Sequence, residues 1–153
     1  MNNLILASRL ASLYDGEPST PSDAELSDLV GFIDAQYMEI SVPVIYVDCA
    51  LNLPDTVQHL NDHGKLLISI AHNSHPYLTP AQNARFRAVH DWHHIESCAD
   101  STLSGEIKAF KLARNRAPKS IAWILFSEIV LQAAACIHHG EFQAQKLVKA
   151  GGF

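Results

Sequence analysis

The stretch TPAQNARFRAVHDWHHIES, residues 79–97, carries the signals of a helix with a marked beginning. Thr79 is a preferred N-cap residue, and Pro80 suits the first helical position. Gln82, three residues after Thr79, can complete a capping box. These signals predict a helix from Pro80 to about residue 97. Its second half holds a cluster of histidines, so the helical register decides which of them share a face.

Three histidines and an aspartate fall within five positions of this predicted helix, His90-Asp91-Trp92-His93-His94. Residues four apart lie on one helix face, with Cβ atoms roughly 6 Å apart. His90 and His94 have this spacing, so both imidazoles can reach one ion. His93 is also one turn from His90, but it shares an apolar face with Phe86 and is favoured as a packed histidine.

The segments on either side of this helix have the patterns of further helices and of two strands. β-Branched and aromatic residues predict strands over residues 43–49 and 65–72. Helices are predicted over residues 4–13, 24–37, 56–60, 103–115 and 118–138, with another turn or two within 141–149. The predicted fold is α+β: a mostly helical single domain over residues 1–153, with a small β-sheet preceding a metal-binding helix.

Composition narrows the class of protein. The chain has 153 residues, 48% of them apolar, which is enough for one domain with a real core. A net charge of −5 argues against general nucleic-acid binding. The nine histidines are the unusual feature, because histidine is the commonest protein metal ligand. Three widely spaced cysteines without a CxxC motif fit a reducing compartment, so we expect a cytoplasmic protein.

Neither apolar segment of the chain is predicted to cross a membrane. The first twenty residues lack the basic region and the long apolar core of a signal peptide. The apolar run at 121–137 is interrupted by Glu128 and Gln132, which favours a buried helix over a membrane span. No membrane partner is therefore expected.

A tight site needs a third ligand from another element, and carboxylates suit zinc as well as imidazole does. Glu106 is the nearest candidate, because a short connection makes its helix a neighbour of the histidine helix. Glu128 is the next, since a lone carboxylate in an apolar helix is costly unless it is paired or bound to metal. The predicted cofactor is zinc or another divalent transition metal.

The motif His90-Asp91-Trp92-His93-His94 reads H-D-x-x-H and resembles the zincin motif H-E-x-x-H. With the preceding strand and the following Glu106 helix, residues 65–115 are similar to zincin-like metallopeptidase domains of the ImmA/IrrE type. The resemblance implies that His90, His94 and Glu106 hold the metal and that Asp91 acts as general base. The chain departs from the family at Asp91, which is one methylene shorter than the family's glutamate. The motif segment also resembles phage-encoded domains, which implies the host cytoplasm.

His93, Glu128, Gln132 and His139 are predicted as additional site residues, and each has a plainer interpretation. Glu128 and Gln132 could simply lie on the solvent-exposed face of a partly buried helix. His139 lies where a cationic side chain suits a helix C-terminus. His72 and His75 flank the strand end before the motif helix and could line a cleft.

Other functions stay open at this point. His90-Asp91 is also the dyad of HD-type phosphohydrolases, although no helical aspartate follows Asp100 to complete that ligand set. A small binding or inhibitor protein with a structural metal, or with none, is a further alternative. A di-iron bundle is remote, because the Glu-x-x-His pairs it needs are missing. The sequence leaves open whether the substrate is a peptide, a protein or a small molecule, and whether the chain forms oligomers.

Overall fold

Helices make up 61% of the chain, and the computed structural model describes residues 3–153. The predicted class, mostly helical with a small sheet before the motif helix, is confirmed. The elements in chain order are α1 (Asn3–Tyr14), α2 (Asp23–Met38), β1 (Val44–Val47), α3 (Leu53–His63), β2 (Leu66–Ser69), α4 (Pro80–Ser97), α5 (Leu103–Arg116), a 3-10 turn (Lys119–Ile121), α6 (Ala122–Leu125), a π-helical segment (Phe126–Leu131) and α7 (Gln132–His139).

The sheet consists of β1 and β2, paired in parallel with Val44 opposite Leu66 and Val47 opposite Ser69. Parallel neighbours need a crossover, which α3 supplies. A capping box between Asn52 and Asp55 starts α3. The small sheet packs against α4 and so helps to fix the position of the motif helix.

Helix α4 begins as the sequence predicts. The Thr79 side chain accepts from the Gln82 backbone N–H, and the Gln82 side chain accepts from the Thr79 N–H. Arg87 then ties the helix to the end of β2, because its guanidinium donates to the backbone carbonyls of Ser69, Ala71 and His72. This clamp fixes the position of α4, and with it the histidine cluster.

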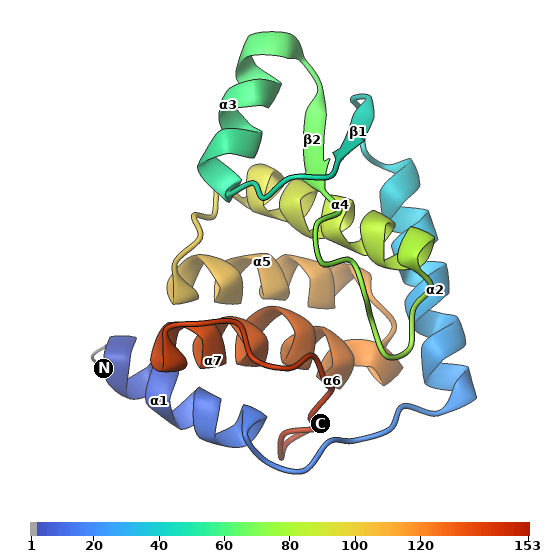
Figure 1. Cartoon of the computed structure of the whole chain (residues 1–153). Helices are drawn as coiled ribbons and strands as arrows, with labels where there is room; N and C mark the ends of the chain where they lie inside the picture. The colour runs from blue at the N-terminus through green and yellow to red at the C-terminus, as the bar shows by residue number, and fades with distance from the viewer. Residues whose placement is uncertain (1–2) are drawn as a thin grey trace.

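The helices lie in layers. Figure 1 shows α1, then α6 with α7, then α5, then α4, with the small sheet above α4 and α2 along one side. The segment Lys119–His139 forms the central layer. By length and composition it could cross a membrane, but 61% of its most apolar window is buried inside the protein. Buried residues such as Ile124, Leu125 and Val130 agree with the predicted core helix.

The end of the chain departs from the prediction. Residues 141–149, predicted to add a turn or two of helix, contain none, because Gly140 ends α7 in the left-handed conformation with φ 77°. The chain then returns along α1 and the π-helical segment. The Tyr14 hydroxyl donates to the carbonyl of Ala144, and the Ser127 hydroxyl accepts from the Val148 N–H. Tertiary partners thus replace the hydrogen bonds that a helix would have made.

Candidate metal centre

His90, His94 and Glu106 converge on one point, as predicted. Nε2 of His94 lies 3.2 Å from Nε2 of His90 and 3.1 Å from Oε2 of Glu106. Nε2 of His90 lies 3.1 Å from the same carboxylate oxygen. The i, i+4 histidine pair of α4 thus faces the first turn of α5. Within residues 3–153 these side chains form a group that could hold a metal ion.

The triangle of ligand atoms has the size that a metal ion requires. Three atoms at these separations lie on a circle of about 1.8 Å radius, which is smaller than the usual zinc–ligand distance of about 2.0–2.1 Å, so one ion could contact all three. Tetrahedral zinc separates its ligand atoms by about 3.3 Å. The side chains therefore fit the ion with adjustments of a few tenths of an ångström.

Hydrogen bonding fixes the tautomer of His94. Its Nδ1 lies 3.2 Å from the carbonyl oxygen of Ala99, an acceptor only, so Nδ1 carries the proton. In its neutral form the ring therefore presents the Nε2 lone pair to His90 and Glu106, which is the usual arrangement of a metal-binding histidine. Nδ1 of His90 is buried and has no hydrogen-bond partner among the described residues. The convergence of lone pairs calls for a cation or a shared proton between these groups.

The electrostatics of the triad favour its charged forms. Burial alone would raise the pKa of Glu106, but hydrogen bonds and charges from both histidines bring that pKa down to about 2. Burial alone would lower the pKa of His94, and the hydrogen bond and charge of Glu106 outweigh it, so that pKa is raised. Glu106 is therefore anionic at any pH near neutral.

A tight connection between α4 and α5 brings Glu106 to the histidines. Cys98 ends α4 in the left-handed conformation, with φ 51°, and the N–H of Ala99 donates back to the carbonyl of His94. Thr102 caps α5 by accepting from the N–H of Gly105. Glu106 follows in the first turn, so its carboxylate points back at the end of α4.

Asp91, the predicted base, lies beside the triad. Burial raises the pKa of its carboxyl group, and the charges of His90 and His94 oppose that rise. No hydrogen bond to its side chain occurs among the described residues. A desolvated carboxylate with unused lone pairs is a favourable proton acceptor.

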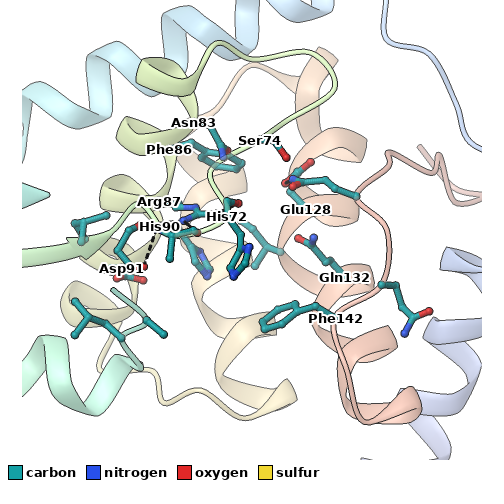
Figure 2. A pocket seen from close by; sticks show the side chains of 18 residues that line it. His72, Ser74, Asn83, Phe86, Arg87, His90, Asp91, Glu128, Gln132 and Phe142 are labelled. Carbon is teal, nitrogen blue, oxygen red and sulfur yellow. Dashed lines mark hydrogen bonds between the residues drawn. The ribbon is translucent and has the colours of Figure 1, made fainter. Parts of the chain in front are cut away.

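A cavity of about 770 Å³ opens beside the triad. Figure 2 shows its two walls, with His90 and Asp91 on one side and Glu128, Gln132 and Phe142 on the other. His90, with 25% of its side chain exposed, is the triad member that reaches the cavity, whereas His94 is 2% exposed. Glu128 and Gln132 thus belong to the pocket but not to the ligand triangle, and His72 lines it as well.

The structure places the remaining predicted site residues elsewhere. His93 points away from the triad into the core, where its Nε2 lies 2.9 Å from Oε1 of Gln36. His139, the last residue of α7, pairs with Asp15, which directly follows α1. His75 does not line the cavity. Its ring is fully buried behind the wall, where it contacts Glu128, a role that no local sequence signal indicated.

The buried His93 predicts an acid-sensitive stability. Burial, reinforced by the charge of Arg116, lowers the pKa of His93 to about 3, whereas the unfolded chain binds this proton near pH 6.5. Below pH 6.5 the unfolded state holds the extra proton, so His93 costs the fold about 2 kcal/mol between pH 7.5 and pH 5. We therefore expect the free energy of unfolding of the wild-type protein, relative to that of His93→Gln, to fall by about 2 kcal/mol between pH 7.5 and pH 5. Urea unfolding of both proteins at the two pH values measures this change. A difference that stays constant would contradict the buried neutral ring.

No family model, curated protein or solved structure matches the chain. The resemblance to zincin-like domains consequently rests on the H-D-x-x-H motif and on Glu106. The structure itself shows a His90–His94–Glu106 triad that could hold a metal ion, in a mostly helical fold.

Proposed function

We propose that this protein is a zinc-dependent hydrolase of the zincin type. His90, His94 and Glu106 hold the metal, and Asp91 is the general base. The observation that carries the proposal is the convergence of two imidazole nitrogens and one carboxylate oxygen within 3.2 Å of one another. A dedicated structural site would more often have four protein ligands, whereas three protein ligands beside a cavity are typical of catalytic zinc.

The donor set favours zinc over the hard cations. Magnesium and calcium prefer cages of oxygen atoms, while zinc accepts two imidazoles and a carboxylate. The exposed edge of His90 in the cavity wall supports access of a substrate from the cavity to a metal held by the triad. When bound, a zinc ion supplies Lewis acidity to hydrolysis at neutral pH.

Asp91 follows His90 directly and lines the same cavity, which supports its role as base for the attacking water. The charges of His90, His94 and Glu106 all act on its carboxyl group, which supports a role for Asp91 in the same site. In the proposed reaction the Asp91 carboxylate accepts a proton from the water and returns it to the leaving group. The Arg87 clamp at the end of β2 holds this part of α4 in place.

We also propose a cytoplasmic location. Cys49, Cys98 and Cys136 are all free thiols, and Cys49 and Cys98 are exposed, which suits a reducing compartment.

Asparagine at position 91 tests the proposed chemistry. We expect Asp91→Asn to retain zinc and to hydrolyse a pool of fluorogenic peptides about 100-fold more slowly than the wild-type protein, or slower still, because the amide cannot accept the proton. Zinc content is measured on the same samples. Asp62→Asn, which changes an exposed aspartate of α3, is the matched control and should keep full activity.

Two outcomes would contradict the hydrolase proposal. One is hydrolysis that survives removal of zinc. The other is a zinc-loaded wild-type protein that cleaves no member of the pool, which would support a binding protein with a structural metal.

A further inference from the structure

Glu128 is a second acidic group in the cavity, on the wall opposite the triad (Figure 2). It lies in the π-helical segment Phe126–Leu131, and π-helical turns often occur at functional sites. Only 6% of its side chain is exposed. Oε1 accepts from Nε2 of His75 at 2.9 Å, and Oε2 accepts from Nε2 of Gln145 at 3.2 Å. Both oxygens therefore act as acceptors, as in an ionised carboxylate.

His75 supports this carboxylate without neutralising it. Nδ1 of His75 accepts from the backbone N–H groups of both Tyr77 and Leu78, at 3.0 Å each. A nitrogen that accepts two hydrogen bonds carries no proton, so the ring is the neutral tautomer with its proton on Nε2. That proton is donated to Glu128, which fixes the direction in which the carboxylate points.

Glu128 consequently keeps an unmatched negative charge. Among residues 3–153 it forms no ion pair with a lysine or arginine. The cavity does contain Arg87, but the guanidinium of Arg87 is committed to three backbone carbonyls at the end of β2. A buried carboxylate without a cation is costly, and a charged ligand would relieve that cost.

The apolar residues of the cavity wall indicate that the ligand has an apolar part beside its charge. Phe142, with 82% of its surface exposed, reaches the cavity from the chain that follows α7, and Phe86 and Ile129 line it as well. Exposed aromatic surface beside an anionic group suits a ligand that carries a cation on an apolar stem.

We propose that the cavity binds an organic cation, a guanidinium or ammonium group on an apolar stem, and that Glu128 is the residue that selects its charge. The proposed ligand is also the substrate class of the proposed hydrolase. Only this identification of the cavity as the substrate site rests on the proposed function.

The test uses the full chain and NMR-monitored titration of two probes, 2-phenylethylguanidinium and its neutral isostere 2-phenylethylurea. Neither is a strong metal ligand at neutral pH, so binding can be compared in metal-free and zinc-loaded protein. We expect the guanidinium to bind the wild-type protein about tenfold more tightly than the urea, or tighter still, and Glu128→Gln to abolish that preference. The amide oxygen of glutamine can still accept from His75, so the wall keeps its shape. Glu141→Gln, an exposed acid outside the cavity lining, is the matched control and should retain the preference.

Equal affinity for both probes in the wild-type protein would overturn the assignment, whatever the fold of the variant. So would a preference that persists in Glu128→Gln. Zinc binding is measured separately on the same samples. A guanidinium preference without zinc binding contradicts the hydrolase but not the role of Glu128, whereas zinc binding without the preference contradicts only the role of Glu128.

Discussion

Replacing His90 with alanine is expected to lower the affinity for zinc by more than about 100-fold. Loss of a partner that only orients a ligand already costs about 10–100-fold in metal affinity, and the loss of a ligand itself costs more. His90 is the most exposed member of the triad, with 25% of its side chain accessible, so its removal leaves the core intact. Competition with a chromophoric zinc chelator at pH 7.5 measures the change.

His138→Ala is the matched control for that substitution. His138 is an exposed histidine at the end of α7, so it changes the histidine count without touching the triad. We expect wild-type affinity in this variant and circular dichroism spectra that overlay for all three proteins. Equal affinities for His90→Ala and the wild-type protein would show that zinc binds elsewhere.

Alanine at Gly105 is expected to destabilise the protein by about 2–3 kcal/mol. A Cβ atom at this position would overlap the backbone carbonyl and the side chain of Asp100, well inside van der Waals contact. A backbone cannot rotate away as a flexible side chain can, so the first turn of α5 has to move. Glu106 is the next residue, and we expect zinc affinity to fall together with the free energy of unfolding.

Gly31→Ala provides the opposite control. Gly31 lies in the interior of α2, and a Cβ atom there would meet nothing within 4 Å. Alanine should therefore stabilise the helix by about 0.5–1 kcal/mol and leave zinc binding unchanged. Urea unfolding of both variants measures the two effects. A Gly105→Ala protein as stable as the wild type would contradict the close packing of the α4–α5 connection.

The local elements of the fold were predictable because their signals are local. Capping boxes at Ser22 and Thr79 mark the starts of α2 and α4 in the sequence, and both form in the structure. The same signal occurs at Asn52 and Asp55, where α3 begins at Leu53 and runs to His63, beyond both ends of the predicted helix at 56–60. The triad was predictable for the same reason. His90 and His94 have the i, i+4 spacing of one helix face, and a short connection leads to Glu106.

The remaining features depend on contacts between distant segments. Glu128 and its buried partner His75 are 53 residues apart, so no spacing rule links them. The segment at 141–149 also depends on distant contacts. Leu147 and Val148 are buried, and this segment is not helical but hydrogen-bonds to Tyr14 and Ser127. His139 lies away from the triad for a related reason, since its partner Asp15 comes from the other end of the chain.

Anomalous diffraction at the zinc edge, from crystals of the protein equilibrated with one equivalent of zinc, examines the metal centre most directly. The geometry predicts a single strong peak about 2.0–2.1 Å from Nε2 of His90, Nε2 of His94 and the nearer oxygen of Glu106. A map without a peak between these three side chains, or with its main peak at His138 and His139, would contradict the proposed metal centre and the hydrolase built on it.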